Sequence, residues 1–98
     1  MKESQLQTKV LTYIRKALIP HEDLFCWKAS DKFIAGIPDI VGFYKGSPFA
    51  IELKIPGNKT TAIQDVTIMR MRRAGVPVAV CYSVEEVKEF IDREVLNE

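Results

Sequence analysis

Two acidic residues and a lysine in the middle of the chain have the types and spacing for chemistry on a phosphate ester. Asp39 ends the segment Gly36-Ile-Pro-Asp39, and after twelve further residues comes Glu52-Leu-Lys54. Two carboxylates that converge on one point repel each other unless a cation or a proton lies between them. Carboxylates, water and a substrate phosphate are the usual ligands of Mg²⁺, and a lysine beside them can stabilise developing phosphate charge. The three residues therefore suit metal-assisted hydrolysis of a phosphodiester.

A β-hairpin is the element that must bring these residues together. The apolar runs Ile40–Tyr44 and Phe49–Ile55 flank the turn residues Lys45-Gly-Ser-Pro48. Two runs rich in β-branched, aromatic and aliphatic residues around Gly and Pro are typical of two strands joined by a turn.

The position of the turn sets which residues face each other. A loop centred between Gly46 and Ser47 predicts Asp39 opposite Lys54. Because side chains alternate between the faces of a strand, Asp39, Glu52 and Lys54 then share one face. The two acids become diagonal neighbours, roughly 7–8 Å apart at the backbone, which is within reach of one divalent cation. The spacing also allows a plain structural interpretation, in which Asp39 starts a strand and Glu52-Leu-Lys54 is a solvated strand face.

A helix is predicted over residues 4–19, ended by Pro20, because one apolar stripe runs through Leu6, Val10, Ile14 and Leu18. Glu3 extends this stripe towards the N-terminus. However, Ser4-Gln-Leu-Gln7 also fits a capping box, which would leave Glu3 just outside the helix. The sequence leaves the place of Glu3 open.

The remaining elements alternate between strands and helices. Leu24–Lys28 is predicted as a strand and residues 29–37 as a loop. Thr61-Ala-Ile-Gln64 is a capping box that opens a helix to about Ala74, and Val76–Tyr82 is an apolar strand expected to be buried on both faces. A further capping box begins the last helix, Ser83 to about Val95. The order α-β-β-β-α-β-α predicts an α/β fold, a mixed four-stranded sheet flanked by helices.

Size and composition indicate one globular domain. The chain has 98 residues, of which 47% are hydrophobic and 28% charged. No apolar run approaches the roughly 18 residues of a membrane-spanning helix, and the N-terminal residues lack the apolar stretch of a signal peptide. We therefore expect a cytoplasmic protein without a membrane partner. Cys26, Cys81 and His21 show no zinc-ligand spacing and predict no metal site of that kind.

The formal net charge of +1 means that any surface for nucleic acid must be local. A near-neutral monomer is expected to bind DNA weakly, because non-specific affinity scales with the number of phosphates neutralised. For the arginine run, a solvated helix face near a helix C-terminus is an equally good interpretation. The candidate nucleic-acid-binding residues are Lys28, Lys32, Lys59, Arg70, Arg72 and Arg73.

Gly36-Ile-Pro-Asp39 followed by Ile51-Glu-Leu-Lys54 resembles the Asp…Glu-x-Lys signature of the PD-(D/E)XK nuclease superfamily. The wider sequence resembles its VRR-NUC family, which adds an early helical Glu, a Gln-bearing helix and an Ala-Gly-Val step into a strand. The matching residues are Glu3, Gln64 and Ala74-Gly-Val76. The resemblance spans nearly the whole chain and implies a single VRR-NUC domain over residues 1–98. The implied fold is the restriction-endonuclease-like αβββαβα core.

The resemblance implies a DNA endonuclease that depends on Mg²⁺ or Mn²⁺ and on no small-molecule cofactor. Asp39 and Glu52 would bind the metal with the Leu53 carbonyl, and Glu3 would bind through water or complete a second site. Lys54 would orient or activate the attacking water, assisted by Gln64. From the residues alone, Gln64 is the cap of Thr61, and the two uses compete for one side chain.

Small members of the superfamily resemble junction resolvases and phage nucleases, which cut two strands as homodimers. The implied function is therefore cleavage of branched, Holliday-junction-like or duplex DNA by a homodimer in the cytoplasm, which for a phage- or prophage-encoded protein is that of the host. Two alternatives remain. One is a non-catalytic nucleic-acid-binding or assembly module on the same fold. The other is an α/β interaction domain in which Asp39 and Glu52 lie on opposite faces of the sheet.

Overall fold

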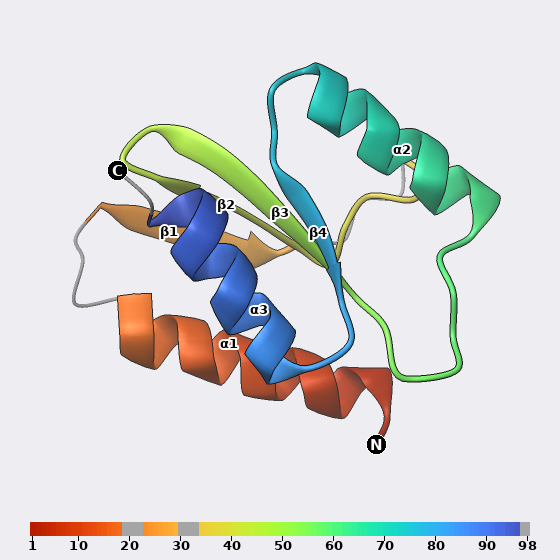
Figure 1. Ribbon diagram of the computed structural model, residues 1–98, viewed down its shortest axis with the longest axis horizontal. Helices are drawn as coiled ribbons and strands as arrows, with labels where there is room; N and C mark the ends of the chain where they lie inside the picture. Colours follow the sequence, from red (N-terminus) through yellow and green to blue (C-terminus); the bar gives the residue numbers. More distant parts are fainter. Residues whose placement is uncertain (19–22, 30–33, 97–98) are drawn as a thin grey trace.

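The elements of the computed structural model follow one another in the predicted order (Figure 1). The structure describes residues 1–18, 23–29 and 34–96, without the side chains of 17 and 18. The elements are α1 (Glu3–Leu18), β1 (Leu24–Lys28), β2 (Ile40–Tyr44), β3 (Ser47–Leu53), α2 (Ala62–Arg73), β4 (Val78–Cys81), α3 (Val84–Phe90) and a short π-helical segment η1 (Ile91–Val95).

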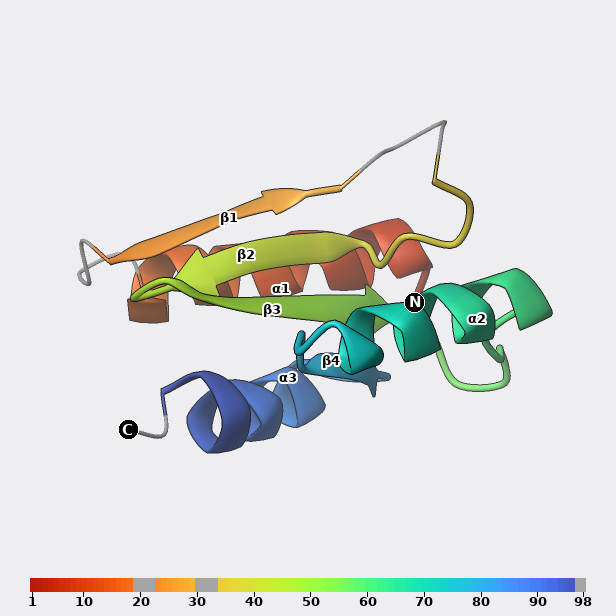
Figure 2. The same ribbon diagram turned by 90° about the horizontal axis from the view of Figure 1, so that it is seen from above.

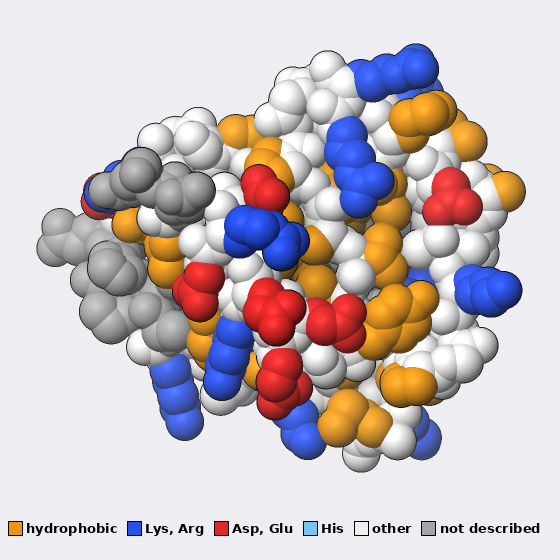
Figure 3. All heavy atoms as spheres, in the orientation of Figure 1, with side chains coloured by type: hydrophobic (Ala, Val, Ile, Leu, Met, Phe, Trp, Pro, Cys, Tyr) orange, Lys and Arg blue, Asp and Glu red, His pale blue; other side chains and the backbone are white. Residues whose placement is uncertain are grey.

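The strands form one mixed four-stranded sheet, as predicted, and their order in it is β1-β2-β3-β4. The pairs β1·β2 and β2·β3 are antiparallel, and β3·β4 is parallel because α2 forms a crossover between them. Helices α1 and α3 pack together on one face, whereas α2 lies on the other face towards β3 and β4 (Figures 1 and 2). Acidic side chains gather over α3 on the first face (Figure 3).

The last strand has a core on each face, as expected, but it is not completely buried. β4 lies at the edge of the sheet, so its residues gain cover from helices on both faces but from a neighbouring strand on one side only. Val78 and Cys81 are buried, whereas Ala79 and Val80 are only half-buried. The sequence of β4 is apolar because the strand packs between helices, and not because it lies in the centre of the sheet.

The predicted hairpin register is also wrong, by two residues. Tyr44 pairs with Ser47, so the loop consists of Lys45 and Gly46 alone. Both have positive φ, 50° and 81°, as in the two-residue turns whose twist matches that of the flanking strands. Continuing this register places Asp39 opposite Glu52 instead of Lys54. Because the shift is even, every side chain keeps its predicted face.

The main core lies between the sheet and the pair α1 and α3. The apolar stripe predicted for α1 is confirmed for Leu6, Val10 and Ile14, each at most 2% exposed, while the Leu18 side chain lies outside the described residues. These residues pack with Phe49, Ile51, Leu53, Cys81, Val87, Phe90 and Ile91. A smaller core of Ala50, Ile68 and Val78 lies under α2. The two cores fix both helices against β3.

Three helix starts were predicted from capping boxes, and the structure treats them differently. At α2 the box is complete, since Thr61 and Gln64 each bond the other's backbone N–H. At α3 the Ser83 side chain accepts from the Glu86 N–H. The box at Ser4 is wrong, because α1 already begins at Glu3 and places Ser4 inside the helix. The Gln7 side chain is therefore free to make a tertiary contact.

Gly42 provides a test of the packing between β1 and β3. A Cβ at this position would lie 2.6 Å from Cys26 Cβ and 2.7 Å from Phe49 Cζ. We expect Gly42→Ala to lower the free energy of unfolding by about 1–3 kcal/mol through overpacking, measured by urea denaturation. Ser47→Ala, an exposed change in the same hairpin, is the control. Equal stability of the two variants would contradict this packing.

Candidate active site

Asp39 stands at the start of β2 with both carboxylate oxygens held. Oδ1 accepts a hydrogen bond from Gln7 Nε2 at 3.1 Å, and Oδ2 accepts one from the Leu53 N–H at 2.8 Å. The preceding loop is pressed against the first turn of α2, since a Cβ at Gly36 (φ 77°) would lie 2.8 Å from the Ile63 carbonyl oxygen. Only glycine allows this approach at that backbone conformation. The direction of Asp39 is thus fixed from three sides.

Glu52 is the buried acid of the site. It lies near the end of β3, is 2% exposed, and its Oε2 accepts from Gln64 Nε2 at 3.0 Å. Burial and then the negative charge of Asp39 raise the pKa of Glu52 to about 7, against the opposing effect of Lys54. The two carboxyl groups are close enough to share a hydrogen bond when Glu52 is protonated. The pair therefore favours a proton or a cation between its oxygens.

Lys54 joins the N-terminus of α1 to the end of β3. Its Nζ lies 3.3 Å from Glu52 Oε2 and 3.8 Å from Glu3 Oε1, and its side chain is only 12% exposed. The Lys54 N–H donates to the Cys81 carbonyl, so β4 fixes its backbone. The ammonium group is thereby held beside the acidic pair.

The Gln64 side chain makes the predicted cap and also contacts the buried acid. Its oxygen accepts from the Thr61 N–H at 2.9 Å, while its nitrogen donates to Glu52 at 3.0 Å. The cap therefore orients the nitrogen towards the buried acid. The sequence could not show this, since it depends on where α2 begins relative to β3.

Gln7 is a site residue that sequence reasoning missed. It lies one helical turn after Glu3, so the two polar side chains share a face of α1 and meet Asp39 and Lys54 respectively. The signal in the sequence was a pair of polar residues on an otherwise apolar stripe. The incorrect capping box assigned Gln7 to the helix backbone instead.

The donor set fits a hard divalent cation. A carboxylate has about four lone-pair sites, so the hydrogen bonds from Gln7 and Leu53 to Asp39 leave others for a metal. Mg²⁺ is commonly held by one or two carboxylates with waters and substrate phosphate, which is what Asp39 and Glu52 offer. Within residues 1–18, 23–29 and 34–96 no three His, Cys, Asp or Glu side chains cluster as metal ligands. Glu3 lies beside Lys54, with its Oε1 3.8 Å from the Lys54 Nζ.

The basic residues fall into two groups. Lys28 is exposed at the end of β1, where the next residue, Ala29, donates its N–H to the Asp39 carbonyl. Lys59 is exposed just before α2, near the same end of the sheet. Lys32 lies outside the described residues. The backbone that follows Lys28 is therefore bonded directly to that of Asp39.

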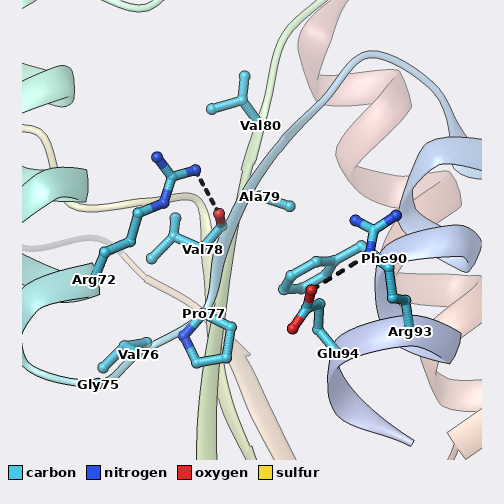
Figure 4. Close-up of a pocket in the computed structure, with 10 residues that line it drawn as sticks. All are labelled: Arg72, Gly75, Val76, Pro77, Val78, Ala79, Val80, Phe90, Arg93 and Glu94. Carbon is cyan, nitrogen blue, oxygen red and sulfur yellow. Dashed lines mark hydrogen bonds and ion pairs between the residues drawn. The ribbon is translucent and has the colours of Figure 1, made fainter. Parts of the chain in front are cut away.

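The arginine run lies at the other end of α2, about 9–13 Å from Gln64 along the helix axis. Arg70 and Arg73 are exposed. The Arg72 guanidinium donates to the Val78 carbonyl at 2.8 Å, beside a cavity of about 670 Å³ along the outer edge of β4 (Figure 4). None of the predicted catalytic residues lines this cavity. Arg72 thus satisfies a backbone group of the edge strand.

A mixed four-stranded sheet flanked by helices, with Asp, Glu and Lys gathered at one end, defines the class of restriction-endonuclease-like α/β proteins. The family model described as "VRR-NUC domain" matches residues 2–85. The chain therefore belongs to the VRR-NUC domain family, which is a family of nucleases.

A comparison of folds agrees with this assignment. A solved structure titled "VRR_NUC domain" superposes with a TM-score of 0.72 and 22% sequence identity, over 89% of this chain and 95% of the other. At that identity the likeness concerns the fold. A search of curated proteins finds no match. Among the described residues, no helix is long and apolar enough to cross a membrane.

The raised pKa of Glu52 predicts how stability depends on pH without metal. Between the usual value of 4.5 and about 7, the folded state binds more protons than the unfolded state. The free energy of unfolding should therefore fall as pH rises through this range and stay lowered above it. Glu52→Gln should reduce the slope, measured by urea denaturation in EDTA from pH 5 to 8.

Glu85→Gln, which changes an exposed glutamate on α3, is the control and should keep the parental slope. If Glu52→Gln and Glu85→Gln depend on pH alike, Glu52 is not the group whose proton is retained on folding.

Proposed function

We propose that the protein is an endonuclease that hydrolyses DNA phosphodiester bonds with Mg²⁺ or Mn²⁺. The observation that carries this proposal is the meeting of Asp39 and Glu52 with the Lys54 ammonium, 3.3 Å from Glu52 Oε2, at one end of the sheet. The interaction-domain alternative predicted the two acids on opposite faces of the sheet. The observed register keeps both on the face of α2, which argues against that alternative.

Each residue has a separate task in this proposal. Asp39 and Glu52 would hold the metal with the Leu53 carbonyl, and Glu3 would bind through water or complete a second site. When bound, the metal would supply a Lewis acid and lower the pKa of a water molecule. Lys54 would orient the attacking water and stabilise negative charge on the phosphate. Gln64 and Gln7 keep the carboxylates in place, and the products carry a 5′-phosphate and a 3′-hydroxyl.

We further propose that residues 1–98 act as one domain, and that two copies cut branched or duplex DNA together. The subunit measures 35 × 32 × 23 Å, so it offers limited surface for a duplex. Pairing two subunits brings two sites to two strands and doubles the number of cationic residues such as Lys28 and Lys59.

The second candidate is a nucleic-acid-binding or assembly module without chemistry. The complete set of Asp39, Glu52 and Lys54 argues against it, because a module that lost catalysis has no need for a buried acid beside another acid. Burying Glu52 costs stability in the absence of function. Metal binding separates the two candidates.

Removal of the lysine or the first acid tests the catalytic proposal. Asp39→Ala and Lys54→Ala should each reduce cleavage at least about 100-fold. The first variant loses a metal ligand, and the second loses positive charge at the reacting phosphate. The measurement is a panel of four-way junction, flap, duplex and single-stranded DNA with Mg²⁺, Mn²⁺ or EDTA. Lys9→Ala, an exposed change on α1, is the control. Folded variants that cut as fast as the parent would refute the proposal.

Calorimetric titration with Mn²⁺ tests the metal site directly. The parent should bind, and Asp39→Asn and Glu52→Gln should weaken binding at least about 10-fold. Affinity should increase with pH up to about 7, because Glu52 must lose its proton to bind metal. Glu85→Gln should bind like the parent. If both site variants still show the Mn²⁺-binding heat of the parent, the result would favour the non-catalytic module.

A further inference from the structure

Three aromatic side chains form an exposed surface on the sheet. Phe25 and Trp27 of β1 and Phe43 of β2 are 66%, 41% and 42% exposed. Their rings contact one another, with centroids 5.6 Å apart for Phe25 and Trp27 and 6.2 Å apart for Trp27 and Phe43. We call these residues the aromatic surface. In Figure 2 no described helix lies in front of β1 and β2, since α2 is confined to the β3–β4 side.

The aromatic surface lies on the same face of the sheet as the acidic pair. Asp39, Val41 and Phe43 alternate to one side of β2, and the register pairs Trp27 with Val41 and Phe25 with Phe43. Trp27 is thus about 7 Å from Asp39 along the strand direction. Stacked nucleotides are about 3.4 Å apart, so a strand whose phosphate lies at Asp39 reaches Trp27 within a few nucleotides.

Charge distinguishes this surface from the region around α3 and η1. Acidic side chains gather over α3 and η1 (Figure 3), which repel phosphate. They are Glu85, Glu86, Glu89, Asp92 and Glu94, against Lys88 and Arg93. Positive charge beside the acidic pair comes from Lys54, whose Nζ lies 3.3 Å from Glu52 Oε2, whereas Lys28 pairs with Ile40 and points to the other face of the sheet. A polyanion at the site is therefore disfavoured along α3 and η1.

Aromatic rings offer a π-face, which distinguishes this surface from an ordinary apolar patch. Unpaired bases stack on such rings with little regard to sequence. Bases inside a duplex stack on each other and cannot present their faces. A second copy of the chain seated here would cover the face onto which Asp39 and Glu52 open, so the site argues for nucleic acid as the occupant.

We propose that the aromatic surface binds unpaired bases of the substrate strand beside the scissile phosphate. The protein then prefers nucleic acid that contains a single-stranded segment next to the cleavage position. This inference rests on the proposed nuclease function for the identity of the substrate, and it names a substrate feature that the acidic pair cannot select by itself.

Trp27 is the only tryptophan of the chain, so its fluorescence reports on this surface alone. In EDTA, where no cleavage occurs, a single-stranded 12-mer should quench the emission, and a blunt duplex hairpin of equal phosphate content should quench it far less. Phe25→Leu and Phe43→Leu, which keep apolar bulk but lose the ring, should weaken single-strand binding about 5-fold or more. Phe25→Tyr should restore binding. Ile63→Leu, at an exposed residue of α2, is the control.

Three outcomes would overturn the inference. The first is equal quenching by single strand and duplex, and the second is an affinity of the leucine variants for single strand that equals that of the parent. The third is a dimer, measured by sedimentation, that the leucine variants dissociate while DNA binding is unchanged, which would identify a second copy as the occupant. Quenching as expected without cleavage in Mg²⁺ or Mn²⁺ would instead refute the proposed function and leave the binding surface in place.

Discussion

The burial of Glu52 beside Asp39 is the interaction on which the rest of the site depends. Two carboxyl groups at a poorly solvated end of the sheet repel each other, and the surroundings offset this with donors from three elements. Gln7 comes from α1, the Leu53 N–H from β3 and Gln64 from α2, with Lys54 completing the set. No buried side-chain nitrogen or oxygen among the described residues lacks a hydrogen-bond partner, so the remaining requirement is a positive charge.

The need for positive charge at the acidic pair fits the positions of α1 and α2, which both begin there. The N-terminal end of each helix carries partial positive charge, and both ends lie at the acidic pair, through Glu3 with Lys54 and through Gln64 with Glu52. The apolar cores under the two helices fix them against β3 from opposite faces. Packing far from the site therefore sets the position of the donors, and the fold stabilises two acids that would otherwise separate or protonate.

The two faces of the molecule differ in what they can approach. Acidic side chains gather over α3 on one face, whereas the face with α2 carries the acidic pair, Lys54 and the aromatic surface of Phe25, Trp27 and Phe43. With a net charge of only +1, affinity for nucleic acid has to come from this local arrangement. Stacking supplies binding that does not depend on total charge.

The sequence by itself determined what local chemistry controls. The bounds of β1 and β2, the capping box at Thr61 and the shared face of Asp39, Glu52 and Lys54 follow from alternation, propensity and short-range hydrogen bonds. Tertiary structure decided the rest. The two-residue turn at Lys45 and Gly46 set the hairpin register. The position of β4 at the edge of the sheet left this strand partly exposed. The packing of α1 placed the Gln7 side chain against Asp39 instead of in an N-terminal cap. These outcomes depend on contacts between residues far apart in sequence, which periodicity and spacing do not encode.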